Sequence, residues 1–276
     1  MKKKSVLKIL LVNIINKSQF LKPIIFTLRN LNKLKNFMKK YIITFCSFLL
    51  VISNINAQIK NLPEYFKAMD KFLSANVKAG RVNYKGINAD KKDLDALVTY
   101  VGVKQKFNSP SEEKAFYLNA YNVLVIKGII NNYPTKGPME ITGFFDKKLN
   151  VINGASLTLN NIENDIIRKK FNDARIHFAL VCGAKSCPPI QPYAFKPEKL
   201  DAQLEQVTKQ SIQNTSFTKI NTKTNRVSVS MLFNWYKDDF IKAKGNVLNF
   251  LNGYLKTPLP ANTAIENYTY DWALNG

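Results

Sequence analysis

The sequence has one histidine, His177, and three cysteines in 276 residues. It has no internal repeat, no heptad run, and no glycine-rich phosphate loop or dinucleotide fingerprint, so nucleotide chemistry is disfavoured. Histidine titrates nearest neutral pH and thiolate is a strong nucleophile. His177, Cys182 and Cys187 all fall within residues 175–189. If the protein performs nucleophilic or metal chemistry, this segment is where we expect it.

Acidic residues are missing from residues 1–57, which hold 11 of the 41 lysines and arginines. A short basic start at Met38, an apolar run over 41–53 and the small residue Ala57 are typical of a secretory signal, and the run is shorter than the ~20 residues that span a bilayer. We predict cleavage after Ala57 and export to the periplasm or beyond the cell. Translation is expected to start at Met38, with residues 1–37 a misassigned extension. The alternative is a long signal or a membrane-anchoring amphipathic segment.

Removal of the first 57 residues lowers the net charge from +22 to +11, because 30 basic residues then face 19 acidic ones. This charge suits contact with anionic envelope polymers or lipid head groups, and it binds nucleic acid only non-specifically. No later apolar run is long enough for a transmembrane span. We therefore expect an envelope component or an unidentified substrate as the partner, no specific nucleic acid and no cofactor.

The remaining 219 residues are enough for one domain with a core. Ser109 as N-cap, Pro110 at the first helical position and Glu112 three residues after the cap predict the start of a helix that runs to residue 132. Apolar spacing predicts further helices. They cover residues 62–77, 90–103, 160–171, 197–214, 231–242 and 246–255.

The clearest β signal is Asn153-Gly154, which favours a type I′ turn between strands at 149–152 and 155–158. Other extended segments are predicted at 81–84, 175–182, 226–230 and 268–272. Helices outnumber strands and no regular alternation of strands and helices occurs. We predict a single α+β domain over residues 58–276, mainly helices packed on a short mixed or antiparallel sheet.

Five segments in order carry a resemblance to a known family. They are EKAFYLNAYN at 113–122, LTLNNIE at 157–163, RIHFALVCG at 175–183, FNWYKDDF at 233–240 and YDWALN at 270–275. These segments resemble the DUF547 family, a domain of unknown function found in exported bacterial proteins and in plants. The resemblance spans almost the whole chain after residue 57. It implies a shared fold and gives no activity or catalytic residue.

A strand at 175–182 would place His177 and Cys182 on opposite faces. Cys187 follows after a short loop that can fold back toward the histidine. It also precedes Pro188 in an arrangement compatible with a helix N-terminus, which lowers the pKa of a thiol. Cys187 is therefore the candidate nucleophile, His177 the candidate base, and Cys182 a packed, inert thiol.

Two other interpretations of the cysteines stay open. A disulfide between Cys182 and Cys187 fits their spacing and an oxidising compartment. It would exclude a nucleophilic Cys187. Zinc held by His177, Cys182 and Cys187 is the third interpretation, although the fourth ligand is unidentified and the spacing matches no standard zinc pattern.

A catalytic histidine needs an orienting partner. Glu163, on a predicted helix, is one candidate, unless it pairs with Arg168, Arg175 or a nearby lysine. Asn119 and Asn122 share one side of a helix, where they orient His177 or serve as oxyanion donors. Alternatively, the two amides satisfy backbone groups of strand edges or loops, and the histidine is a buried neutral imidazole.

An aromatic and acidic patch is predicted at Trp235, Tyr236 and Asp239. It is either core plus a surface pair or a wall on which a ligand stacks.

The candidate residues leave two function classes open for the chain. One is a thiol-dependent hydrolase or acyl-transfer enzyme of the cell envelope with a Cys-His pair. The other is a non-catalytic binding or scaffold module in which a Cys182–Cys187 disulfide staples a loop.

Overall fold

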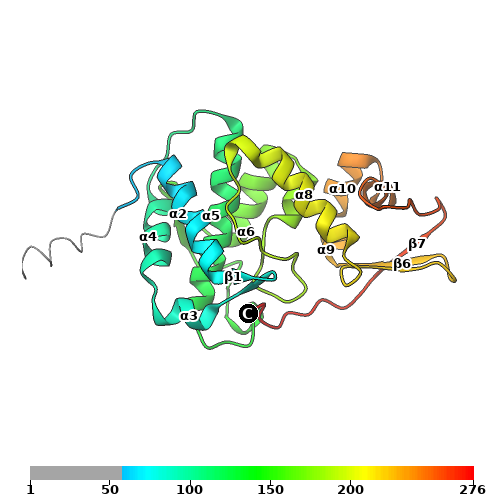
Figure 1. Cartoon of the computed structure of the whole chain (residues 1–276), viewed down its shortest axis with the longest axis horizontal. Coiled ribbons are helices and arrows are strands. Elements are labelled where there is room, and N and C mark those ends of the chain that lie inside the picture. Colours follow the sequence, from blue (N-terminus) through cyan, green and yellow to red (C-terminus); the bar gives the residue numbers. More distant parts are fainter. Residues whose placement is uncertain (1–57) are drawn as a thin grey trace, which may run out of the picture. The chain divides into compact units, whose positions relative to one another are not determined.

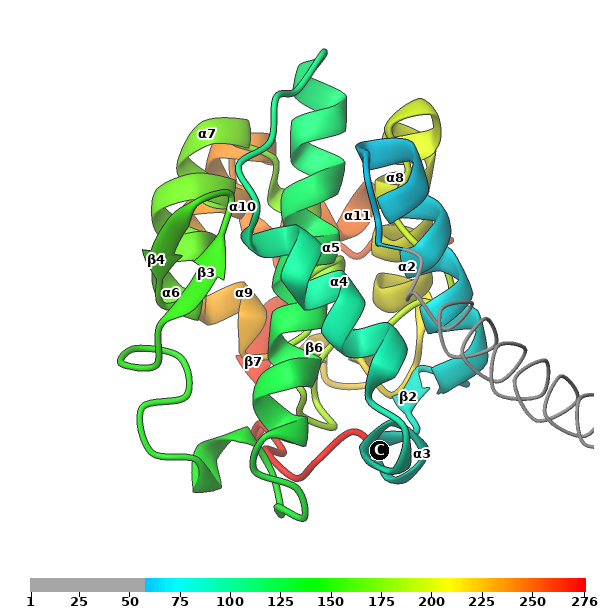
Figure 2. The same cartoon turned by 90° about the vertical axis from the view of Figure 1, so that its left-hand side faces the viewer.

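Helix α5 (Pro110–Ile130) lies at the centre of the computed structural model, which describes residues 58–276 (Figures 1 and 2). Every residue from 115 to 126 is buried, as expected for a helix that is covered on all sides. The predicted signal peptide and the extension before it lie outside the described residues.

The predicted start of α5 is confirmed. The Ser109 hydroxyl accepts the Glu112 backbone N–H at 3.1 Å, and Pro110 occupies the first turn. The Glu112 carboxylate accepts from the Asn108 N–H at 2.6 Å, one residue before the partner that a capping box requires. The helix thus begins where the sequence predicts, because its cap is made of neighbouring residues.

Helices α2 (Leu62–Asn76), α3 (Tyr84–Ala89) and α4 (Lys92–Gly102) pack on one side of α5 (Figure 2). The predicted helices at 62–77 and 90–103 are confirmed to within two residues at each end. Their apolar stripes are buried, with Tyr65 and Met69 fully inaccessible to solvent. Helix α3 has no counterpart among the predicted elements.

On its other side α5 contacts a continuous helix of three parts: α6 (Leu159–Asn161), the π-helical η2 (Ile162–Arg168) and α7 (Lys169–Phe171). The predicted helix over 160–171 is confirmed. The π segment was not predicted. π-Helical turns are frequent at functional sites, and this one contains the buried Glu163.

The strands form three small sheets. In the first, β1 (Val77–Lys78) pairs with β2 (Arg81–Val82), and in the second, β3 (Asn150–Ile152) pairs with β4 (Ala155–Leu157). In the third, β6 (Arg226–Val229) pairs antiparallel with β5 (Thr218–Asn221) and parallel with β7 (Ala264–Asn267). The α+β class is confirmed.

The predicted hairpin is also confirmed. Asn153 and Gly154 both have positive φ angles, 50° and 79°, as a type I′ turn requires. The Asn153 side chain also accepts the Gln105 N–H at 2.7 Å, so the turn is bonded to the chain that follows α4.

The helices after residue 190 are η4 (Pro197–Lys199), α8 (Leu200–Gln213), α9 (Leu232–Trp235), α10 (Lys237–Lys244) and α11 (Val247–Asn252). They match the predicted helices, except that the segment predicted over 231–242 is divided at Tyr236. Across residues 58–276, no helix combines the length and apolar character that a membrane crossing requires.

Two predicted strands are wrong. Residues 175–182 form the 3₁₀ turn η3 (Ala174–Phe178) and then irregular chain. Residues 176–181 are all buried, so no alternation of exposed and buried positions exists. Residues 268–272 are irregular too, because β6 pairs with the preceding segment, β7. From β7 the tail runs back toward β1 and α3 (Figure 1).

Candidate functional site

The five segments that resemble DUF547 each contribute a residue to one cluster of buried or half-buried side chains. We call it the five-segment cluster: Tyr121, Glu163, His177, Tyr236 and Tyr270. The Tyr121 hydroxyl donates to Glu163 Oε2 at 3.0 Å, and the Tyr236 ring stacks on the His177 ring with centroids 3.8 Å apart. Besides burial, the charge of Glu163 raises the pKa of Tyr236 and of Tyr270, so five segments that are distant in sequence meet at one place.

Glu163 is the only carboxylate in this cluster, and its partners are tyrosines. Burial raises the pKa of Tyr121 and of Tyr236, and the charge of Glu163 raises both further. Both hydroxyls therefore remain protonated, and that of Tyr121 donates to the carboxylate. Neither predicted partner is used: Arg168 pairs with Asp239, and Arg175 pairs with Asp173, Asp201 and Glu205.

The partner of His177 is Asp239, on α10. His177 Nε2 lies 2.7 Å from Asp239 Oδ2, and Arg168 approaches the same carboxylate with Nε at 2.8 Å and Nη2 at 3.0 Å. Burial by itself raises the pKa of Asp239, but the hydrogen bonds from His177 and Arg168 outweigh it and hold that pKa well below its usual range. The carboxylate is therefore ionised, and the His177 Nε2–H donates to it.

His177 is only 2% exposed, between Tyr236 and Phe240. The Arg168 guanidinium lies 4.9 Å from the centre of the Tyr236 ring, which is within the range of a cation–π contact. Asp239 was predicted only as part of an aromatic and acidic patch with Trp235 and Tyr236. The proximity of Asp239 to aromatic residues was the one sequence signal that pointed to it, because 62 positions separate Asp239 from His177.

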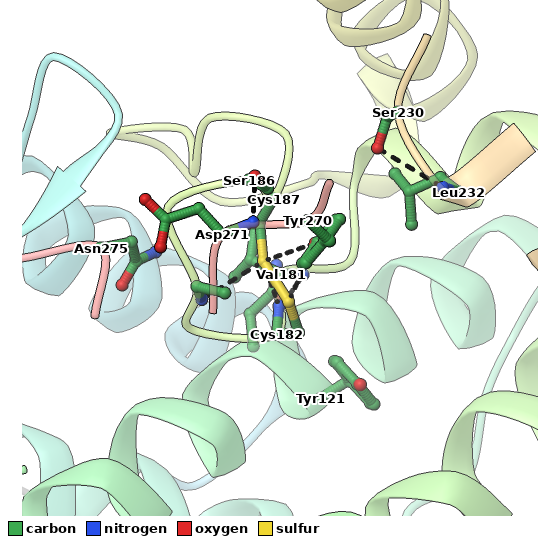
Figure 3. Close-up of a disulfide and its surroundings, with 12 residues drawn as sticks. Tyr121, Val181, Cys182, Ser186, Cys187, Ser230, Leu232, Tyr270, Asp271 and Asn275 are labelled. Carbon is green, nitrogen blue, oxygen red and sulfur yellow. Dashed lines mark hydrogen bonds between the residues drawn. A yellow bond between two sulfur atoms is a disulfide. The ribbon is translucent and has the colours of Figure 1, made fainter. Parts of the chain in front are cut away.

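Cys182 and Cys187 form a disulfide (Figure 3). Within residues 58–276, no hydrogen bond or salt bridge joins His177 to either cysteine. The Tyr270 hydroxyl lies 3.3 Å from Cys182 Sγ and 3.4 Å from Cys187 Sγ. While the two sulfur atoms are joined, neither is available as a nucleophile or as a zinc ligand. The part of the chain that the structure describes also groups no three His, Cys, Asp or Glu side chains around a potential metal position.

The predicted helix N-terminus at Cys187 is wrong, because residues 185–196 contain no helix. Backbone amides nevertheless face its sulfur atom. The Cys182 N–H lies 3.1 Å and the Ala184 N–H 3.4 Å from Cys187 Sγ. The tight loop between the two cysteines, with Gly183 at a φ of 82°, orients these amides.

Asn119 and Asn122 hold irregular backbone rather than His177. The Asn119 side chain accepts the Phe195 N–H at 3.0 Å and donates to Phe195 O at 2.7 Å. The Asn122 side chain accepts the Val181 N–H at 3.0 Å and donates to Ala179 O at 2.9 Å. Both amides are buried, and their hydrogen bonds satisfy backbone groups of the protein, which is the alternative role considered for them from the sequence.

The loop between the cysteines carries the C-terminal tail. The Lys185 N–H donates to Ala273 O at 2.8 Å, and the Asp271 N–H donates to Ser186 Oγ at 2.8 Å (Figure 3). The Asn275 N–H donates to Gly183 O at 3.1 Å. The loop closed by the disulfide, which we call the staple, and the C-terminal tail therefore form one unit.

Two aromatic side chains of the tail, Tyr270 and Trp272, meet Trp235 of α9, and we call these three residues the aromatic platform. Tyr270 is 4.9 Å from Trp235 and 4.8 Å from Trp272 between ring centroids, and the two indoles are 5.8 Å apart. Tyr270 is buried beneath, Trp272 is half-buried, and Trp235 is 43% exposed. The patch predicted at Trp235 is thus partly core and partly accessible surface.

Residues 105–212 match the family model described as "Protein of unknown function, DUF547". The resemblance to DUF547 is confirmed. The matched DUF547 segment contains Tyr121, Glu163, His177 and both cysteines of the disulfide, whereas Tyr236 and Tyr270 lie beyond it. No curated protein and no solved structure matches the chain. The description of DUF547 names no activity, so a function has to be argued from the site.

Proposed function

We propose that this protein is a non-catalytic binding module of the cell envelope that recognises a glycan through the aromatic platform. The observation that carries the proposal is the Cys182–Cys187 disulfide, which staples the loop that holds the platform's tail. A Cys-His hydrolase would need a free Cys187 beside His177. Here the thiol is paired, and the Nε2 of the histidine is bonded to Asp239.

Sugars suit the platform for chemical reasons. The exposed face of Trp235 offers a flat apolar surface, and aromatic side chains combine large contact area with little loss of conformational freedom. Asn234 and Asp271, the exposed chain neighbours of Trp235 and Trp272, supply an amide and a carboxylate, and the exposed Lys185, bonded through its backbone to Ala273, supplies a cation. Because both charge signs are present, this set favours a polar ligand rich in hydroxyl and amide groups over one with a single strong charge.

The staple gives the platform its rigidity. Four backbone N–H groups, those of Lys185, Ser186, Asp271 and Asn275, are bonded between the loop and the tail. A surface that is ordered before binding loses less conformational entropy when the ligand arrives. The predicted secretory signal and the positive charge of residues 58–276 are consistent with a partner in the envelope.

Tryptophan fluorescence tests the proposal, because Trp235 and Trp272 are the two tryptophans of the chain. We expect saturable quenching or a blue shift with a tetramer of β-1,4-linked N-acetylglucosamine, and a loss of affinity of about tenfold or more in Trp235→Ala, as for an aromatic residue at the centre of a binding surface. Ile220→Ala on β5 is the matched control, because Ile220 is also 43% exposed.

Two results would count against the proposal. One is the absence of saturable binding to this tetramer and to a glucose tetramer with the same linkage. The other is unchanged affinity in a folded Trp235→Ala variant. Intact mass without reductant provides a separate check on the staple: we expect two hydrogens fewer than in the dithiol form and no uptake of an alkylating reagent.

A further inference from the structure

We propose that the Cys182–Cys187 pair is a thiol–disulfide exchange site in which Cys187 is the leaving thiolate. Three donors converge on Cys187 Sγ: the Cys182 N–H at 3.1 Å, the Ala184 N–H at 3.4 Å and the Tyr270 O–H at 3.4 Å (Figure 3). Within residues 58–276, Cys182 Sγ is approached by the Tyr270 hydroxyl alone, at 3.3 Å, and it shares that one proton with Cys187 Sγ. The two sulfur atoms of one bond therefore lie in unequal surroundings.

The donors to Cys187 Sγ favour the reduced state, in which the disulfide is broken. Sulfur in a disulfide is a weak hydrogen-bond acceptor, whereas a thiolate carries a full charge and makes the stronger, charge-assisted kind of hydrogen bond. The same three donors therefore stabilise a Cys187 thiolate more than they stabilise the closed disulfide. Burial keeps the pKa of Tyr270 well above its usual value, so its hydroxyl retains the proton that it donates.

Two cations reinforce this preference. Cys187 lines a cavity of about 180 Å³ together with Arg81 and Lys185, and no carboxylate lines it. Neighbouring lysine and arginine side chains lower the pKa of a thiol. Because a thiol of lower pKa leaves faster in exchange, the cavity and the donors act in the same direction.

The site of attack follows from exposure. Cys187 is 8% exposed and Cys182 is half-buried, so an incoming thiolate reaches Cys182 Sγ more readily. A small-molecule thiolate RS⁻ attacks Cys182 Sγ, the Cys182–Cys187 bond breaks, and its electron pair goes to Cys187. A second RS⁻ attacks the mixed disulfide at the sulfur of R, which releases RSSR and the Cys182 thiolate. The protein gains two electrons, and the thiol supplies them.

Single-cysteine variants test the asymmetry. The rate of alkylation by iodoacetamide against pH gives the thiol pKa in Cys182→Ser, which keeps Cys187, and in Cys187→Ser, which keeps Cys182. We expect the pKa of Cys187 to lie at least about one unit below that of Cys182. Adding Tyr270→Phe to Cys182→Ser should raise the pKa of Cys187. The control is Tyr100→Phe, whose lost hydroxyl contacts Gln105 rather than sulfur.

The protein with both cysteines provides a second test that does not depend on those variants. In glutathione buffers of increasing reducing strength, peptide mass should place the mixed disulfide on Cys182. Arg81→Gln and Lys185→Gln should each shift the equilibrium severalfold toward the closed disulfide, whereas Lys209→Gln, an exposed lysine on α8, should not.

Equal pKa values for the two thiols in folded variants would overturn the proposal, and so would a mixed disulfide on Cys187. A disulfide that stays closed in the most reducing buffer would overturn it as well. Glycan binding is measured on the oxidised protein without thiol, so failure of that proposal and failure of this one are told apart.

Discussion

His177 Nε2 lies 2.7 Å from Asp239 Oδ2, and this pair connects η3 to α10 across 62 positions of sequence. Arg168 on η2 shares the same carboxylate, and the Tyr236 ring lies against both the imidazole and the guanidinium. The single histidine of the chain thus lies where η3, η2 and the first turn of α10 meet. This arrangement gives His177 a role in stability.

We expect His177→Ala to lower the free energy of unfolding by about 3 kcal/mol, because it removes a buried ring and one partner of an ionised carboxylate. Urea denaturation measures the change. With Asp239→Asn as the second substitution, a double-mutant cycle should give a coupling of about 1 to 3 kcal/mol. A loss of under about 0.5 kcal/mol would show that the pair does not stabilise the fold.

Asn122→Ala is expected to cost about 2 to 3 kcal/mol, because it leaves the buried Val181 N–H and Ala179 C=O without their side-chain partner. Asn122→Asp keeps an acceptor for Val181 but places a buried carboxylate against the Ala179 carbonyl, so its cost near neutral pH should be at least as large. Thermal and urea unfolding measure both. If Asn122→Ala unfolds like the unsubstituted protein, backbone support is not its function.

The parts of the fold that the sequence predicts are those whose partners are local. Ser109 caps the Glu112 N–H three residues away, and the Asn153-Gly154 turn depends on its own φ angles. The strand expected over 175–182 failed because an apolar run of this length does not distinguish a buried strand from buried irregular chain. The irregular chain is held here by hydrogen bonds to Asn122, which lies almost sixty positions earlier in the sequence.

In the candidate site, too, contacts between residues close in sequence could be predicted, and contacts between distant residues could not. The disulfide joins residues five positions apart, so spacing was enough to include it among the interpretations. Glu163 was correctly placed on a helix, but its tyrosine partner lies 42 positions away on α5. The helix start expected at Cys187 was inferred from one proline. The three donors to its sulfur come from loop geometry and from Tyr270, 83 positions later.

Acid should destabilise the protein through Asp173. Burial raises the pKa of this carboxyl, but hydrogen bonds from Arg175 and Lys114 outweigh it and lower the pKa from 3.8 to about 2. A carboxyl with a depressed folded-state pKa contributes its full stability above its unfolded value, and the contribution is lost as the pH falls toward the folded value. We expect a loss of about 2 kcal/mol between roughly pH 4.5 and pH 2 from this group.

Asp173→Asn is the variant that isolates this contribution. It keeps an acceptor for the Arg175 N–H at the start of η3 and removes the charge. Its free energy of unfolding, measured by urea at several pH values, should be lower than that of the unsubstituted protein at pH 7 and should converge with it near pH 2. A constant difference across this range would assign the stabilisation to packing instead.

Gly137→Ala should displace the C-terminal tail. A Cβ at Gly137 would lie 2.1 Å from Trp272 O, and the neighbouring Lys136 O accepts the Leu274 N–H at 2.7 Å. The φ of Gly137 is 168°, an extended conformation open to any residue, so the conflict is steric alone. Because the backbone of the tail has to move, we expect the free energy of unfolding to fall by about 1 to 3 kcal/mol, together with altered Trp272 fluorescence and weaker glycan binding.

Gly102→Ala is the control, since its Cβ would make only an ordinary contact with Val151 at 3.5 Å. If Gly137→Ala binds the glycan with unchanged affinity, the position of Trp272 does not govern recognition and the binding surface is reduced to Trp235 and its polar neighbours.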